Sequence, residues 1–222
     1  MAESYQTEEE QLEALKRWWD ENGKSTIATI ALALGVGFGW QYWQGQQQER
    51  SEVASGVYQD MLEAVSNAGE NPELLATGRN LAETLKTDYP GTTYAQFAAL
   101  HLAKLAVARD DLAAAEQELR WVLSSGPARE IELVAQLRLA RVAAAQGNPQ
   151  SALAMIEGEE SGSYAAVYAE AEGDFLQQLG ELERAGVAYA QAVAEYQAGG
   201  QTVPPMLQVK IATLTRDSGA QQ

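Results

Sequence analysis

The chain has 222 residues, with 31 acidic and 15 basic side chains and a formal net charge of −16. This balance argues against a nucleic-acid partner, because a phosphate backbone is bound by clustered lysine and arginine. The absence of cysteine excludes disulfides, thiol catalysis and thiolate metal sites, and the single histidine, His101, cannot supply a multi-histidine metal site. The abundance of alanine, leucine, glutamate and glutamine predicts an all-α fold.

The first predicted element is a short helix within residues 1–24. Thr7–Glu10 fits a capping box, which starts a helix. The large apolar side chains that follow on or beside one helix face are Leu12, Leu15, Trp18 and Trp19. Asn22-Gly23 predicts its end, because glycine adopts the left-handed cap conformation at little cost. Such a helix would lie on the cytoplasmic leaflet of a membrane; a disordered acidic tail as far as about Lys16 is the alternative.

Residues 25–45 are predicted to form a transmembrane helix. No residue from Ser25 to Gln48 is charged. The mainly apolar part, Ile27 to Trp43, would span roughly 26 Å as a helix, which is the short end for a membrane span. Amphipathic aromatic rings at its far end suit the membrane interface: Trp40, Tyr42 and Trp43.

This segment has two other interpretations. A cleaved signal peptide is disfavoured, because the preceding residues are acidic and no suitable cleavage site follows. A buried helix of a soluble domain stays open, because the segment is rich in glycine and only moderately apolar. Gly35 and Gly39 form a G-x-x-x-G pair that permits close helix packing in a membrane. Glycine is also common in membrane helices without such a role.

The distribution of basic residues predicts the orientation of this anchor. Lys16, Arg17 and Lys24 precede it, whereas only Arg50 follows within the next twenty residues. Because lysine and arginine favour the cytoplasmic side, residues 1–24 should be cytoplasmic and residues 46–222 should be translocated. In a bacterium with an outer membrane, the translocated part lies in the periplasm.

The rest of the chain is predicted to be a helical-repeat array. Small residues recur at intervals of 37, 37 and 33 residues, at Gly78, Ala115, Ala152 and Ala185. A small residue stands twelve positions before each, at Ser66, Ala103, Ala140 and Gly173. Turn signals separate the later pairs: Arg109-Asp110-Asp111, Gly147-Asn148-Pro149 and Gly180-Glu181.

This spacing resembles the tetratricopeptide repeat, a helix–turn–helix unit of about 34 residues with small residues where its two helices cross. The aromatic residues of the full first-helix signature are mostly absent, and an unrelated helical bundle is the alternative. Pro204-Pro205 predicts the start of a final helix at about 204–216, and its apolar stripe suits the polar-faced cap that a repeat array needs.

Catalysis finds little support in the sequence. Nucleophile, zinc-protease and phosphate-loop motifs are missing, and the glycines of the GVGFG run lack the strand and spacing of a dinucleotide site. His101 lies among leucines without a second titratable partner suited to catalysis. We therefore expect no enzyme activity, no metal and no cofactor; a hidden hydrolase is a third, less favoured class.

The chain as a whole resembles the YfgM family of bacterial inner-membrane proteins. The resemblance is carried by LEALKRWWDENGK before the anchor, GWQYW at its end, the degenerate repeats, and LRLARV at Leu137–Val142. It implies an ancillary subunit of the SecYEG translocon that works with the periplasmic chaperone PpiD on newly exported polypeptides. The residues alone indicate only a membrane-anchored helical adaptor, and an adaptor of another envelope assembly, for division or polysaccharide export, is the alternative.

The same resemblance to tetratricopeptide arrays implies a binding groove lined by the first helix of each unit. Transferred to this sequence, it places the following residues toward the groove: Phe97, Leu100, Lys104, Leu137, Arg141, Glu170 and Asp174. The basic and apolar positions lie in the middle units, and the acidic ones in the last. The alternative for the apolar residues is ordinary packing against neighbouring helices.

Overall fold

The structure is a computed structural model that describes residues 3–69 and 71–220, with side chains at 11–69 and 71–214. The helices are α1 (Glu3–Ala68), α2 (Pro72–Asp88), α3 (Thr93–Val107), α4 (Leu112–Ser124), α5 (Arg129–Ala145), α6 (Pro149–Ile156), the 3₁₀ turn η1 (Gly162–Tyr164), α7 (Ala165–Gln178), α8 (Leu182–Ala198) and α9 (Pro205–Ala220). They form two compact units, Met1–Glu52 and Val53–Gln222, and α1 runs through the boundary. The prediction of an all-α fold is confirmed.

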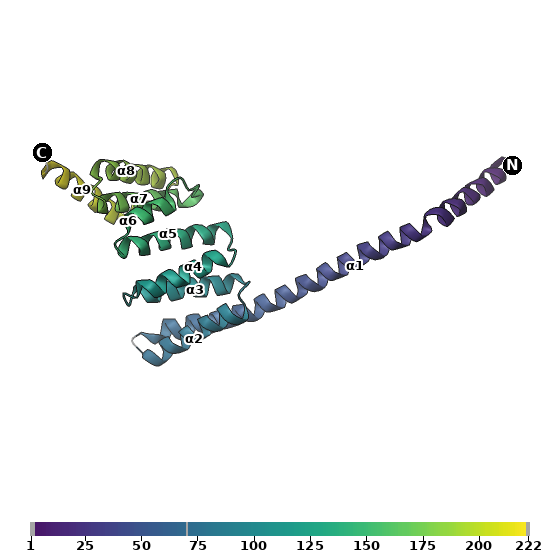
Figure 1. Cartoon of the computed structure of the whole chain (residues 1–222), viewed down its shortest axis with the longest axis horizontal. Coiled ribbons are helices and arrows are strands. Elements are labelled where there is room, and N and C mark those ends of the chain that lie inside the picture. The colour runs from purple at the N-terminus through teal and green to yellow at the C-terminus, as the bar shows by residue number, and fades with distance from the viewer. Residues whose placement is uncertain (1–2, 70, 221–222) are drawn as a thin grey trace. The chain divides into compact units, whose positions relative to one another are not determined.

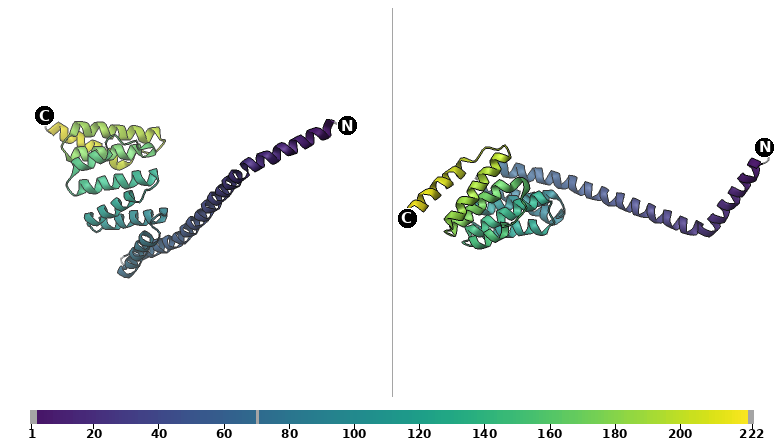
Figure 2. Two further views of the ribbon diagram at one scale, coloured as in Figure 1. Left: turned by 45° about the vertical axis from the view of Figure 1, so that its right-hand side comes forward. Right: turned by 90° about the horizontal axis from the view of Figure 1, so that it is seen from above.

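The predicted helix end at Asn22-Gly23 is wrong, because α1 continues through it. Gly23 is buried beneath its neighbour in the helix: a β-carbon built at Gly23 would lie 3.3 Å from the Trp19 ring. The Asn22 amide donates to the Trp18 carbonyl oxygen, and the Thr26 hydroxyl donates to the Asn22 carbonyl oxygen. Such side-chain bonds to the preceding turn bend helices. Figure 2 shows a bend in this N-terminal part of α1.

The predicted membrane anchor lies wholly inside α1. Within residues 3–69 and 71–220, no helix is both long enough and apolar enough to cross a membrane. The anchor over 25–45 therefore stays a prediction.

The second unit is a stack of helices in chain order (Figure 1). Each helix from α2 to α8 packs against the next one in the chain. Apolar residues at the end of α1 join the first core cluster with α2 and α3: Ala54 and Met61 are fully buried there beside Ala82 and Leu85. The last part of α1 thus belongs to the core of the repeat domain.

The recurring small residues lie where paired helices cross most closely. Ala115, Ala152 and Ala185 are fully buried. A β-carbon at Gly173 of α7 would lie 2.4 Å from the Tyr189 ring of α8, and one at Gly78 of α2 would lie 2.5 Å from Val65. The first unit departs from the pattern, because Ser66 is exposed.

The three predicted turns share one backbone geometry. Asp110, Gly147 and Gly180 all adopt positive φ angles, of 61°, 85° and 78°. In each turn, the amide of the next residue donates to a carbonyl five positions back, as in Asp111 to Ala106 at 2.9 Å. This is the Schellman closure of a helix C-terminus. Two of the turns use glycine, which reaches positive φ without strain, and aspartate tolerates it better than most residues.

Candidate protein-binding groove

The candidate groove residues of the middle units lie on α3 and α5. Phe97, Leu100 and Lys104 are successive positions of one α3 face, and Arg141 lies on α5. Two adjoining hollows run along these helices and share Lys104 and Arg138 among their lining residues. The groove is defined below as these two hollows.

The larger hollow has a volume of about 530 Å³ and is mixed in character. Phe97 and Leu100 line it together with Tyr58, whose ring centroid lies 6.1 Å from that of Phe97. Glu130 of α5 also lines it. These two rings give the larger hollow an apolar, aromatic wall.

His101 also lines the larger hollow, and its Nε2 atom is buried without a hydrogen-bond partner. Burial lowers the pKa of His101, and the nearby charges of Lys104 and Arg138 lower it further. The imidazole is therefore held neutral at pH values where an ordinary histidine begins to protonate.

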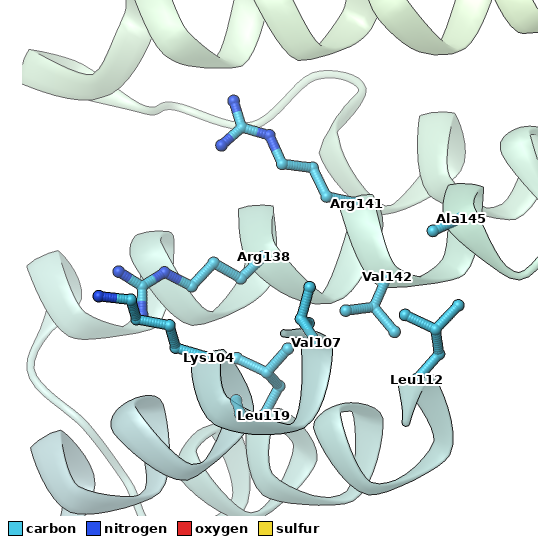
Figure 3. Close-up of a pocket in the computed structure, with 9 residues that line it drawn as sticks. Lys104, Val107, Leu112, Leu119, Arg138, Arg141, Val142 and Ala145 are labelled. Carbon is cyan, nitrogen blue, oxygen red and sulfur yellow. The ribbon is translucent and has the colours of Figure 1, made fainter. Parts of the chain in front are cut away.

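The smaller hollow, of about 320 Å³, combines an apolar floor with three cationic side chains. Figure 3 shows Lys104 and Arg138 reaching out side by side, while Arg141 points away from them. The floor consists of Ala103, Val107, Leu112, Leu119, Val142 and Ala145. No acidic side chain of the described residues lines this hollow.

The three remaining groove candidates are placed differently. Leu137 is 5% exposed and belongs to the core beneath α5 and α7. Glu170 and Asp174 bind the α9 side chain Lys210, whose Nζ lies 2.8 Å from Glu170 and 2.7 Å from Asp174. Burial alone would lower the pKa of Lys210, but its hydrogen bonds to Asp174 and Glu170 raise it above the usual value. The acidic end of the predicted groove is thus occupied by the chain's own last helix.

Sequence reasoning missed Arg138 and Tyr58. Arg138 lies three residues before Arg141, so the i, i+3 spacing along a helix could have placed both on neighbouring faces. Tyr58 belongs to the end of α1, and only the packing of that segment against α3 brings it near Phe97. In the described part of the chain, no three histidine, cysteine, aspartate or glutamate residues are placed to hold a metal ion.

The uncharged segment of α1 exposes large apolar side chains, with exposed fractions of 53–72%. These are Ile27, Ile30, Leu32, Leu34, Val36, Phe38, Trp40, Tyr42 and Trp43. Trp18 and Trp19 are about half exposed. A β-carbon at Gly35 or Gly39 would meet no atom within 4 Å. A contiguous apolar surface of this kind marks an interaction site for protein or lipid.

Comparison with known proteins decides the family. The tetratricopeptide repeat-like domain matches residues 16–216. The "Ancillary SecYEG translocon subunit" of Haemophilus influenzae is 32% identical, over 95% of this chain and 100% of its own length. The protein of that name from Escherichia coli is 30% identical, over 96% of this chain and 99% of its own length. The chain belongs to the YfgM family.

Family membership confirms the resemblance inferred from the anchor and repeat motifs. The YfgM relative from Neisseria gonorrhoeae, which carries the same name, is 26% identical over 84% of this chain and 87% of its own length. No solved structure was found to match the chain.

Proposed function

We propose that this YfgM-family protein is a membrane-anchored, non-catalytic adaptor that binds other proteins at the SecYEG translocon. The carrying observation is that relatives aligned over nearly their full length are named as ancillary subunits of that translocon. The repeat architecture supports the protein-binding role, because stacked helix pairs create extended concave surfaces. The partners would be SecYEG itself, the chaperone PpiD and newly exported polypeptides.

The proposed anchor is the 25–45 segment of α1. Its support is the uncharged run from Ser25 to Gln48 together with the exposed apolar side chains, for which lipid is a suitable environment. Trp18, Trp19, Trp40, Tyr42 and Trp43 would lie at the two membrane interfaces. The N-terminus would be cytoplasmic and the repeat domain periplasmic, in the bacterial inner membrane.

Anchoring gives a weak groove a useful local concentration. A binding surface tethered close to the translocon meets its partners at an effective concentration in the millimolar range for short linkers. The proposed anchor ends at residue 45 and the compact unit of the repeat domain begins at Val53, so only a few residues separate them. The adaptor would therefore work close to the membrane surface.

Co-purification from membranes tests this proposal and the role of the glycine pair together. The tagged protein should recover SecYEG and PpiD from detergent-solubilised membranes, read by mass spectrometry. Replacing both Gly35 and Gly39 with leucine should reduce that recovery about tenfold, because leucine side chains would hold the two helices apart; a tenfold loss corresponds to about 1.4 kcal/mol of binding free energy.

Gly37→Leu is the matched control, because two residues along a helix turn the side chain to nearly the opposite face. It should leave recovery unchanged. Recovery of a division or polysaccharide-export assembly in place of SecYEG would overturn the proposed function. Equal losses of recovery in the control and the double variant would show that Gly35 and Gly39 do not form the contact with the partner.

A further inference from the structure

The cations of the groove have no acidic partner within the described part of the chain. Two lysines elsewhere in the repeat domain lie against a neighbouring helix and have acidic partners there: Lys86 lies 2.8 Å from Glu118 of α4, and Lys210 binds two carboxylates of α7. Among the described residues, no carboxylate lies within ion-pair distance of Lys104, Arg138 or Arg141.

A third hollow shows the contrast. It is formed mainly by α2, α3 and the start of α4, with a volume of about 410 Å³. Arg79 and Arg109 line it together with the acidic residues Glu83, Asp111 and Glu118. Two basic side chains there lie among three acidic ones, so the positive charge of that hollow is balanced within the chain, although neither arginine forms an ion pair with the described residues. The smaller hollow of the groove keeps its positive charge, although the whole protein carries −16.

Lys104 and Arg138 lie side by side, so their like charges repel when no anion is present (Figure 3). A carboxylate placed between them would relieve this repulsion and accept charge-assisted hydrogen bonds. The apolar floor beneath them, which includes Val107, Leu119 and Val142, would bury an aliphatic or aromatic side chain next to that carboxylate.

The acidic end of the predicted groove is paired with a lysine of the same chain. Glu170 and Asp174, which hold the corresponding positions on α7, bind Lys210 of α9. The chain thus pairs Glu170 and Asp174 internally, whereas the three cations of the smaller hollow stay free for a partner. An acidic partner would be repelled over most of this protein's surface, so attraction at the groove would also fix where it binds.

We infer that the groove formed by α3 and α5 binds an extended, internal polypeptide segment in which acidic side chains stand next to large apolar ones. The carboxylates lie against Lys104, Arg138 and Arg141, and the apolar side chains fill the floor of the smaller hollow and the aromatic part of the larger one. A passing segment fits better than a chain end, because the two hollows adjoin and share Lys104 and Arg138. This inference rests on the proposed role as a protein-binding adaptor.

A peptide-binding titration tests it on the full-length protein in detergent. The probe is a fluorescent peptide of about twelve residues, which extends to about 40 Å, with glutamate next to leucine or phenylalanine and both ends blocked. A second peptide carries glutamine in place of every glutamate. The acidic peptide should bind at least about tenfold more tightly, and added salt should weaken its binding by screening the charges.

The double variant Lys104→Gln with Arg141→Gln should weaken binding of the acidic peptide at least about tenfold. Arg79→Gln with Arg109→Gln is the matched control, since it removes the same charge from the balanced hollow and should bind like wild type. All four side chains are exposed, so thermal midpoints should stay nearly unchanged. This keeps a loss of binding distinct from a loss of fold.

Equal binding of the two peptides, or equal losses in the two double variants, would overturn the inference. A requirement for a free C-terminal carboxylate would overturn the assignment to an internal segment. The failure of the proposed function is separate: it would show as loss of SecYEG recovery from membranes, whereas failure here would leave that recovery intact.

Discussion

Tyr189→Ala should lower the free energy of unfolding of the repeat domain by about 3–5 kcal/mol, as for other large aromatic residues removed from a core. Tyr189 of α8 is fully buried, and its ring occupies the space left by the missing side chain of Gly173. Its hydroxyl donates to the Asp174 carboxylate at 2.9 Å. Alanine would leave a cavity at this crossing of α7 and α8.

Urea unfolding followed by circular dichroism measures the effect, with Tyr189→Phe as the control. Phenylalanine keeps the ring and removes only the hydroxyl, with its contacts to Asp174 and Gln177, so it should cost about 1 kcal/mol. Gly173→Ala should destabilise by about 1–3 kcal/mol, because its β-carbon would collide with the same ring. If Tyr189→Ala were no more harmful than Tyr189→Phe, the ring would not be the wedge between these helices.

Single cysteines on the two sides of the predicted anchor should label in an all-or-none manner. The natural chain has no cysteine, so Gln11→Cys and Ser163→Cys each create one reporter at an exposed position. With the outer membrane permeabilised, an impermeant thiol reagent should label only position 163. The physical reason is the excess of lysine and arginine before the anchor.

Both positions should label once the inner membrane is dissolved, which controls for reactivity. Labelling of position 11 but not of position 163 in intact cells would reverse the orientation. Labelling of both positions before solubilisation would show that no membrane separates them, which would contradict the predicted anchor.

The repeat pattern could be predicted because it depends on local geometry that recurs. Wherever two helices cross closely, a small residue is required, and the sequence shows such residues at Ala103, Ala115, Ala140 and Ala152. The turn signals were similarly informative, including Asp110, which adopts the left-handed conformation that glycine takes in the later turns.

The helix end at Asn22-Gly23 was mispredicted because glycine has two uses. It can end a helix by adopting positive φ, or it can stay helical and make room for a neighbour. Here the neighbour is Trp19, four residues earlier on the same face. The sequence alone does not distinguish these uses.

The pairing within the candidate groove could not be read from sequence either. Repeat spacing placed Lys104, Glu170 and Asp174 on the first helices of their units. It could not reveal that Lys210, on the last helix, would bind both acids. Such long-range ion pairs leave no periodic signal, and they decide which charges remain available to a partner.

The contact between α1 and the translocon can be tested directly by site-specific photo-crosslinking in living cells. A photo-reactive phenylalanine at Tyr42 would lie on the face of Gly35 and Gly39, since it follows Gly39 by three residues. The same residue at Trp40 would point well away from that face, and both native side chains are aromatic and exposed. We expect adducts between position 42 and a subunit of SecYEG, with far fewer from position 40. Absence of SecYEG adducts from both positions, at normal expression, would contradict it.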